Sequence, residues 1–337
     1  MQKIAIIGCG MMGKTHSKAY QNMKDLDICV KYVSDLDHKK AEVCAQMLNA
    51  EIQTFENILK DPEITIIDLC TQTFTHAELT EKAASMGKNI FCEKPIALSI
   101  TDAQRMIDIC KKNNVKLSVG HVVRFFPEYM KAKEILETPD MGSGAVARFY
   151  RGGNFPSHGT DNWFDDIKKS GGVFVDLSIH DFDYLRTVFG EPESIIARSV
   201  KLSETKECKN NDHGLAVIKF KNGVLAHVEG SWAEPDNMPV GFHTKFEVNT
   251  KNGMIRFDAT ESMTFNLQLK RQQNNYVAAR PSEYNPYEQE LRVFIDAVQN
   301  GSEVKVSGEE ALKSLRVALA ANISAKEKRP VLIEEVK

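Results

Sequence analysis

One short stretch of the chain has the residue types and spacing of a proton-transfer site. Asp176, His180 and Asp183 fall at positions i, i+4 and i+7, which lie on one face of a continuous helix. A histidine beside a carboxylate gains basicity and a fixed orientation, which suits a general base near neutral pH. A salt-bridged surface stripe is the alternative interpretation. The preceding Gly171-Gly172 pair favours a site, because glycine lets a backbone or a ligand come close.

A lysine elsewhere in the chain could stabilise a developing negative charge. Glu93-Lys94-Pro95 directly follows the strand-like run 89–92. Proline disfavours the helical region for the residue before it, so we expect Lys94 to be extended. An ammonium fixed there could hydrogen-bond a substrate hydroxyl and favour its alkoxide. A Lys-Pro pair after a strand is also common in ordinary loops, and the motif alone does not decide between the two.

The first residues contain a glycine turn that predicts dinucleotide binding. The apolar run 4–7 leads into Gly8-Cys9-Gly10-Met11-Met12-Gly13, and helix-compatible residues follow from 14 to 23. In this strand–glycine–helix fingerprint the first glycine permits the tight turn, the second admits the pyrophosphate and the third allows close helix packing. The helix N-terminus then offers free N–H groups to the phosphates. We therefore predict that all six residues of the turn line the cofactor, an ordinary βαβ turn being the alternative.

Asp35 completes this fingerprint and bears on the choice of cofactor. It closes the apolar run 28–33, about 20 residues beyond the glycine turn, where a carboxylate accepts the ribose hydroxyls. A carboxylate there repels a 2′-phosphate, and the adjacent residues include no arginine. The sequence therefore favours NAD, while Lys39 and Lys40 keep NADP possible.

Two further loops, each after a strand-like run, are predicted to line the same cofactor. The expected contacts are Thr71, Thr73 and His76 from the loop 70–76, and Glu93 and Lys94 from the loop after run 89–92. An N-cap at Thr75 is the plainer interpretation of the first loop, and both interpretations can hold.

The order of apolar and amphipathic segments predicts two domains of different architecture. Through residues 1–121 buried strands alternate with helices, which indicates a doubly wound parallel sheet. Residues 122–337 begin with helices and continue with runs rich in β-branched residues. Asn222-Gly223 and Asn252-Gly253 separate such runs, and Asn-Gly is a strong hairpin signal. This half is predicted to be an α+β domain with a large open antiparallel sheet, and two helices close the chain.

The hydrophobic patterns predict the following strands and helices. The expected parallel strands are 4–7, 28–33, 64–69, 89–92 and 116–119, with helices over 39–48, 76–86 and 101–112. The expected second-half strands are 145–150, 194–202, 215–220, 224–232, 245–250, 254–257 and 263–269, with helices over 128–137, 287–299 and 309–326.

Composition narrows the classes of partner. The 337 residues carry 43 basic and 46 acidic side chains, a net charge of −3, so neither nucleic acid nor an anionic membrane is expected. No apolar stretch reaches the length of a membrane span, and the first apolar run feeds the glycine turn instead of forming a signal peptide. Seven cysteines without a CxxC pair indicate reduced thiols of a cytoplasmic protein, with no metal site expected.

Taken together, these motifs resemble the glucose–fructose oxidoreductase/inositol dehydrogenase/rhizopine catabolism (Gfo/Idh/MocA) family of NAD(P)-dependent oxidoreductases. The resemblance rests on the glycine turn 8–13, Asp35, the Glu93-Lys94-Pro95 motif and the stretch 171–183, which occur in the family's order. It implies a Rossmann domain followed by a domain whose open sheet is used for oligomerisation, here as a homodimer or homotetramer. It also implies that Lys94, Asp176 and His180 are the catalytic set.

The amino-acid sequences of residues 179–183 and 124–127 are most similar to those of inositol 2-dehydrogenases. Leu177 stands where those enzymes tend to carry threonine, so a sugar or cyclitol in general is implied more firmly than myo-inositol. The expected substrate contacts are His121, Arg124, Asn154, Trp163, Asp183 and Tyr284. Three alternatives stay open at this point: a cofactor-bound regulator without catalysis, an NAD-assisted glycoside hydrolase, and a reductase of aromatic substrates.

Overall fold

The computed structural model describes residues 1–156, 160–203, 208–235, 237–238, 241–260, 265–269 and 285–337. Contacts divide the chain into two compact units. Unit 1 consists of Met1–Phe125 and Asn285–Lys313, and unit 2 of Phe126–Tyr284 and Ser314–Lys337. The first break lies close to the predicted boundary after residue 121. The return of Asn285–Lys313 to unit 1 is a feature that the predicted division does not contain.

Unit 1 is built on a six-stranded sheet in which every pair of neighbours is parallel. Its strands, in spatial order, are β3 (Glu51–Ile52), β2 (Ile28–Ser34), β1 (Gln2–Ile7), β4 (Ile64–Leu69), β5 (Asn89–Glu93) and β6 (Leu117–Gly120). The order reverses at β1, because β2 lies on one side of it and β4 on the other. In sheets of this kind a ligand binds outside the carboxyl ends of the strands at such a reversal.

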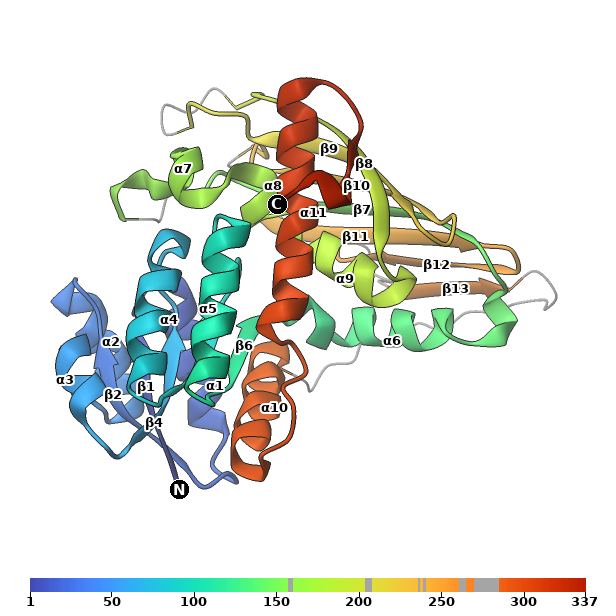
Figure 1. Cartoon of the computed structure of the whole chain (residues 1–337). Coiled ribbons are helices and arrows are strands. Elements are labelled where there is room, and N and C mark those ends of the chain that lie inside the picture. The colour runs from blue at the N-terminus through green and yellow to red at the C-terminus, as the bar shows by residue number, and fades with distance from the viewer. Residues whose placement is uncertain (157–159, 204–207, 236, 239–240, 261–264, 270–284) are drawn as a thin grey trace. The chain divides into compact units, whose positions relative to one another are not determined.

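Helices surround this sheet, as expected for strands that are apolar on both faces (Figure 1). They are α1 (Met11–Asn22), α2 (His38–Leu48), α3 (Phe55–Lys60), α4 (His76–Ser85), α5 (Ile100–Lys112) and α10 (Pro286–Asn300). The last of these comes from the far end of the chain. It buries Leu291, Phe294 and Ile295 in the same core as Ile4 and Phe91, and this apolar contact holds the returning segment in unit 1.

Unit 2 is built on an eight-stranded sheet. In spatial order its strands are β13 (Phe265–Leu269), β12 (Gly253–Asp258), β11 (Phe242–Thr250), β7 (Ala145–Gly153), β10 (Leu225–Ser231), β9 (His213–Phe220), β8 (Pro192–Val200) and β14 (Val331–Leu332). All neighbours are antiparallel except β7 and β10, which are parallel. The predicted open antiparallel sheet is therefore confirmed, except for the parallel pair β7–β10, which makes it a mixed sheet.

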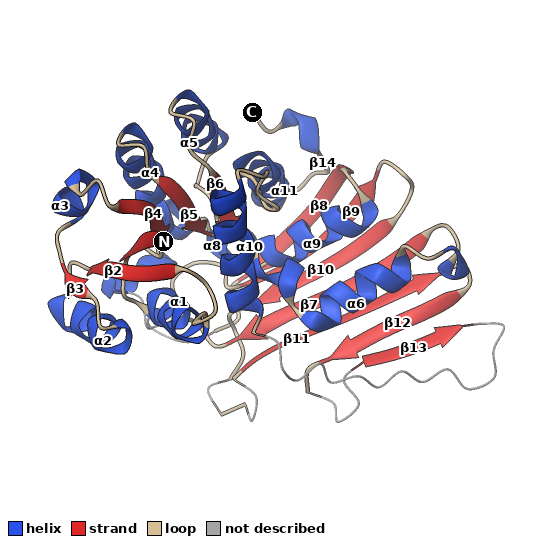
Figure 2. Ribbon diagram, turned by 90° about the horizontal axis from the view of Figure 1, so that it is seen from below, coloured by secondary structure: helices blue, strands red, loops and turns tan. Residues whose placement is uncertain are grey.

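Helices lie along one face of this second sheet (Figure 2). They are α6 (Pro127–Leu136), α8 (Gly172–Asp176), α9 (Ile179–Phe189) and the greater part of α11 (Gly308–Glu327), and the short α7 (Ile167–Ser170) comes directly before α8. Burial alternates along strand β9: Ala216, Ile218 and Phe220 are buried, whereas the alternate residues Leu215 and Val217 are exposed. This period of two is typical of a half-buried strand.

Among the described helices, none has the length and apolarity that a membrane crossing requires.

Candidate active site

The glycine turn connects β1 to α1 at the carboxyl edge of the first sheet. Gly8 has a φ of +93°, and a Cβ there would lie 2.6 Å from the carbonyl oxygen of Cys70, the residue that follows neighbouring β4. A Cβ on Gly13 would lie 2.0 Å from the Gly8 carbonyl oxygen, so the helix touches the turn. Only hydrogen side chains allow this packing.

Gly10 differs from these two glycines, because a Cβ there would meet nothing within 4 Å. It caps α1 without a side-chain hydrogen bond, which leaves the first N–H groups of the helix available. An open glycine at a helix N-terminus fits a pyrophosphate that approaches the backbone closely. Met11 beside it is exposed, whereas the side chain of Cys9 is fully buried, so Cys9 can face a cofactor only through its backbone.

Asp35 follows β2 and is joined to the glycine turn. Its carboxylate accepts hydrogen bonds from the backbone N–H of Cys9 at 2.6 Å and of Asp37 at 2.8 Å. These bonds hold a half-buried negative charge beside the turn, where a ribose would lie on the phosphate-binding loop. Leu36 next to it is fully exposed, and Lys40 lies 3.9 Å from the Asp37 carboxylate. The arrangement fits NAD.

The loop after β4 places its predicted cofactor residues at different depths. Thr71 is half-buried, whereas Thr73 is 3% exposed and His76 is 0% exposed. The His76 ring nitrogens lie 2.9 Å from the Pro95 carbonyl oxygen and 3.1 Å from the Thr71 carbonyl oxygen. Burial lowers the pKa of His76. The sequence-based expectation for His76 is therefore revised, because its side chain joins two loops from the interior.

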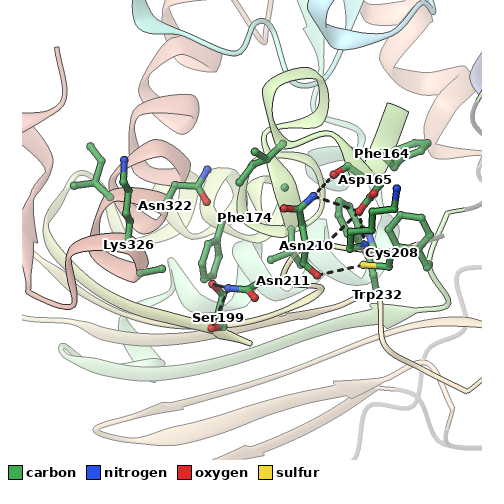
Figure 3. Close-up of a pocket in the computed structure, with 17 residues that line it drawn as sticks. Phe164, Asp165, Phe174, Ser199, Cys208, Asn210, Asn211, Trp232, Asn322 and Lys326 are labelled. Carbon is green, nitrogen blue, oxygen red and sulfur yellow. Dashed lines mark hydrogen bonds between the residues drawn. The ribbon is translucent and has the colours of Figure 1, made fainter. Parts of the chain in front are cut away.

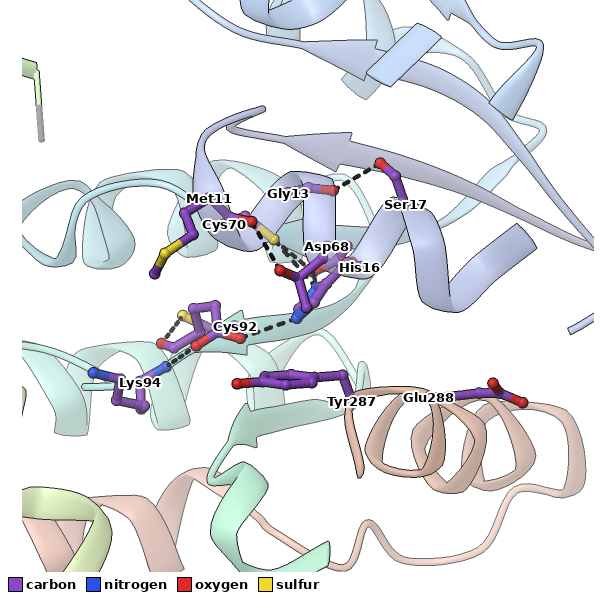
Figure 4. A network of polar contacts seen from close by, with 12 residues as sticks. Met11, Gly13, His16, Ser17, Asp68, Cys70, Cys92, Lys94, Tyr287 and Glu288 are labelled. Atoms are coloured by element: carbon purple, nitrogen blue, oxygen red, sulfur yellow. Dashed lines mark hydrogen bonds and ion pairs between the residues drawn. The ribbon is translucent and has the colours of Figure 1, made fainter. Parts of the chain in front are cut away.

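Lys94 lies directly after β5, half-buried, and its peptide bond to Pro95 is cis. Its backbone N–H donates to the Glu93 carboxylate at 3.2 Å. The other oxygen of that carboxylate lies 3.0 Å from Nε2 of His16 on α1. Nδ1 of the same ring lies 2.9 Å from Asp68 of β4, and Figure 4 shows this network extending from the glycine-turn helix to Lys94.

The network is buried and strongly charged. Burial lowers the pKa of His16, but the Asp68 carboxylate outweighs burial and raises it well above its ordinary value. Glu290 of α10 is 3% exposed, and neither of its carboxylate oxygens has a hydrogen-bond partner among the described residues. Burial, and then the nearby Glu93 carboxylate, raise the pKa of Glu290 well above its ordinary value. Both shifts favour the protonated forms of His16 and Glu290.

Some of these donors also converge closely enough for a metal ion. The sets His16, Asp68 and Cys70, and His16, Glu93 and Glu290, each have their donor atoms within 4.8 Å of one another. Nδ1 of His16 lies 2.9 Å from Asp68, the length of a charge-assisted hydrogen bond, whereas Nε2 lies 3.0 Å from Glu93, within ion-pair distance but without hydrogen-bond geometry. These direct contacts favour a network of hydrogen bonds and ion pairs over a metal site.

In unit 2, Asp176 and His180 lie on either side of a helix break. Asp176 ends α8, and α9 begins at Ile179, so the single helix expected over this stretch is wrong. A spacing of four residues therefore does not by itself put the two side chains on one face. Asp176 is 9% exposed and His180 is half-buried.

Two glycines in the strands beneath set the depth of these helices. A Cβ on Gly214 of β9 would lie 2.6 Å from the Phe174 ring, and one on Gly230 of β10 would lie 2.3 Å from Ser178 Oγ. Glycine inside a strand often marks such a close approach. On α9, the buried Asp181 carboxylate accepts from Arg151 of β7 at 2.8 Å. Ser178 and Asp181, which flank His180 in the sequence, are thus both in contact with the sheet.

The predicted substrate contacts belong to both units. Unit 1 holds His121, 1% exposed, and Arg124, which lies 3.7 Å from Glu310. In unit 2, Asn154 follows β7, and Trp163 stacks on Phe164 with ring centroids 4.0 Å apart.

Asp183 and Tyr284 complete this predicted set. Asp183 is fully buried and accepts from Ser314 Oγ at 2.7 Å, so the expectation of a substrate contact is revised to an interior role. Tyr284 lies outside the described residues. Tyr287 of α10, which we did not predict from the sequence, directs its hydroxyl toward Lys94 in Figure 4.

Unit 2 also contains a cavity of about 490 Å³ beside α8 (Figure 3). Aromatic side chains, among them Phe155, Phe174 and Trp232, form much of its wall. Asn210 is held there by Asp165, whose carboxylate accepts from the Asn210 backbone N–H at 3.2 Å. Of the described substrate candidates, none lines this cavity.

Comparison with known proteins gives matches to both halves of the chain. The family model for the Gfo/Idh/MocA "Oxidoreductase family, NAD-binding Rossmann fold" matches residues 2–121. The model for the "GFO/IDH/MocA C-terminal domain" matches residues 129–256. The two matches together follow the order of the two predicted domains.

Full-length relatives include two inositol dehydrogenases. The myo-inositol 2-dehydrogenase of Thermotoga maritima is 31% identical over 343 residues, covering 99% of this chain and 99% of that protein. The inositol 2-dehydrogenase of Rhizobium meliloti is 30% identical over 340 residues, covering 98% and 99%. The crystal structure of a probable dehydrogenase from Thermotoga maritima superposes with a TM-score of 0.82 at 30% identity, covering 99% of this chain and 100% of that one.

Proposed function

The chain belongs to the Gfo/Idh/MocA family of NAD(P)-dependent oxidoreductases, and we propose that it oxidises a secondary hydroxyl of a cyclitol or sugar. The observation that carries this proposal is the carboxyl edge of the first sheet. Open Gly10, the Asp35 carboxylate and Lys94 follow β1, β2 and β5 of that one parallel sheet. The names of the two inositol dehydrogenases above support a polyol as the substrate class.

In the proposed reaction three side chains handle one proton and one developing charge. His180 removes the hydroxyl proton, and Lys94 stabilises the alkoxide that forms. Asp176 orients the substrate or the imidazole. Bound NAD⁺ supplies the hydride acceptor, so the carbon loses its hydrogen with both electrons of the C–H bond and becomes a ketone.

Asp35 at the carboxyl edge of the first sheet also indicates which cofactor the protein prefers. Asp35 is held beside the glycine turn by the Cys9 N–H, and a fixed carboxylate there repels a 2′-phosphate. NAD is therefore the expected cofactor, with NADP as the weaker one.

The exposed face of the second sheet supports a homo-oligomer, which we propose to be a dimer or tetramer. Val217 pairs with Ile196 in the register of β8 and β9, and both are at least 40% exposed. Leu215, Leu225 and Val146 on neighbouring positions are also exposed. Apolar side chains gathered on one sheet face are typical of an interface.

The seven free cysteines, several fully buried, support a reducing compartment, for which we propose the cytoplasm.

A panel of substrates tests the function. The purified protein is incubated with NAD⁺ or NADP⁺ and with myo-inositol, scyllo-inositol, glucose or their keto forms, and the absorbance of the reduced cofactor is followed. We expect NADH formation with at least one cyclitol or sugar, and slower reduction of NADP⁺. Binding of NADH without turnover of any polyol would contradict the proposal and indicate a regulator. Release of the aglycone from an aryl glycoside without net NADH would indicate a glycoside hydrolase.

A further inference from the structure

Two fully buried histidines contact the segment that carries Lys94, one from each side. His16 reaches it through the Glu93 carboxylate, at 3.0 Å from Nε2. His76 reaches it through the Pro95 carbonyl oxygen, at 2.9 Å from Nδ1. Both rings are 0% exposed, so neither is available at the surface.

The contact through His16 is fixed at its other end. Nδ1 of His16 lies 2.9 and 3.1 Å from the two oxygens of Asp68. The Tyr20 hydroxyl donates to the same carboxylate at 3.0 Å, and the Cys70 thiol lies 3.3 Å from the ring. These contacts hold the imidazole in place, with Nε2 3.0 Å from the Glu93 carboxylate. Since His16 belongs to α1, it couples the glycine-turn helix to the end of β5.

Glu93 transmits this contact to the backbone of Lys94. One carboxylate oxygen accepts from the Lys94 N–H at 3.2 Å. The other, which contacts His16, packs against Gly120 of β6, where a Cβ would lie 3.0 Å away. The carboxylate is thus confined between a helix and a strand. It has little room to move without moving Lys94.

His76 contacts the residue that follows Lys94 in the chain. It begins α4, and its second ring nitrogen lies 3.1 Å from the Thr71 carbonyl oxygen. The ring therefore joins the loop after β4 to the loop after β5. Its contact falls on Pro95, whereas the contact of His16 falls on Glu93, and Lys94 lies between them.

We propose that His16 and His76 are positioning residues that together fix Lys94 for its part in the reaction. The inference rests on the proposed function, because that function gives Lys94 its role toward the substrate hydroxyl. In this role neither histidine touches substrate or cofactor. Displacing a reacting group by about 1 Å can cost about 100-fold in rate, so fixation of the lysine backbone has a measurable consequence.

The test compares His16→Gln and His76→Gln with a matched control. Lys88→Gln serves as the control, because Lys88 is 5% exposed and its ammonium donates to two backbone carbonyls at the opposite end of β5. If His16→Gln does not fold, Glu93→Gln replaces it, since the amide keeps an acceptor for the Lys94 N–H but removes the charge. Steady-state kinetics with NAD⁺ and myo-inositol, or the best polyol found, are measured for each variant.

We expect the histidine variants to lose roughly 10- to 100-fold in kcat with KM changed less than about threefold. With substrate deuterated at the reacting carbon, the isotope effect on kcat should rise, because hydride transfer becomes slower than product release. Lys88→Gln should lose stability but keep the wild-type kcat and isotope effect. Equal losses of activity in all three variants would overturn the proposal, because they would indicate a general effect of destabilisation.

A second measurement does not depend on turnover. Crystal structures of the same proteins with NAD⁺ should show Lys94 displaced or in several conformers in the histidine variants and unchanged in Lys88→Gln. An unmoved Lys94 in His16→Gln and His76→Gln would refute the inference, whatever the substrate panel shows. Elemental analysis closes the test: an equimolar divalent metal that is lost in His16→Gln would overturn the hydrogen-bonded network itself.

Discussion

His180 lies near the start of α9, half-buried, and is the side chain expected to take the hydroxyl proton. General-base help of this kind contributes roughly 10²–10⁴-fold, so His180→Ala should lower kcat by about that factor. The measurement is NADH formation at saturating polyol and neutral pH. His38→Ala is the matched control, because the His38 side chain is 72% exposed at the start of α2. Near-normal turnover in His180→Ala would remove the residue from this role.

Asp35 decides between the two cofactors through its charge. In Asp35→Ser the repulsion of the 2′-phosphate is lost, and we expect the ratio of kcat/KM for NADP⁺ to that for NAD⁺ to rise about tenfold or more. Asp37→Ser is the control, since Asp37 caps α2 by accepting from the Lys39 N–H at 3.0 Å. An unchanged ratio in Asp35→Ser would show that another group selects the cofactor.

At the scale of elements, the close approach of the α8–α9 segment to β10 depends on one missing side chain. Gly230→Ala places a Cβ 2.3 Å from Ser178 Oγ, so the junction between the helices must move. We expect kcat to fall by up to about 100-fold through displacement of His180. Gly241→Ala is the control, because a Cβ there meets nothing within 4 Å. Wild-type kcat in Gly230→Ala would mean that the junction adjusts without moving the histidine.

Helix α10 carries a buried acid whose protonation links folding to pH. The pKa of Glu290 is raised by burial, so the native state holds this proton over a pH range in which the unfolded chain has lost it. Stability should therefore fall as pH rises from about 4.3 toward the raised pKa. Glu290→Gln lacks this dependence of stability on pH. The stability of the variant relative to wild type, measured by urea unfolding, should therefore be higher at pH 8 than at pH 5.

The control for this prediction lies on the same helix. Glu288 accepts from Arg292 at 2.9 Å near the surface, and Glu288→Gln should lose only a surface ion pair. A difference between wild type and Glu290→Gln that stays constant with pH would show that Glu290 is ionised in the native state.

For the whole molecule, the exposed sheet face of unit 2 predicts self-association. Val217→Lys places a charge among Ile196, Leu215 and Leu225, and burying it in an interface would be costly. We expect light scattering to show a multimer for wild type and the single-chain mass of 37.8 kDa for the variant. Val43→Lys is the control, because Val43 of α2 is exposed to a similar degree, 41% against 44%. A multimer that survives Val217→Lys would place the interface elsewhere.

Local sequence by itself determined most elements and the cofactor motif. Strand β4 begins and ends at its predicted residues, and most other boundaries differ by a few residues. The reason is that period-two and period-3.6 patterns, glycine turns and caps act over neighbouring residues. Gly8, Gly10 and Asp35 could be found in the same way. The short β3 and α3 were not predicted, because two strand residues and six helical ones carry too little pattern.

The tertiary structure decided what depends on residues distant in sequence. The break at Leu177–Ser178, the parallel pair β7–β10 and the return of α10 to the first core are set by packing partners far along the chain. The same holds for the network of His16, Asp68, Glu93 and Glu290, which come from four different elements. None of these residues is unusual in its local context. Their chemistry arises because the fold buries them together, where unpaired charges are costly and partners therefore fix one another.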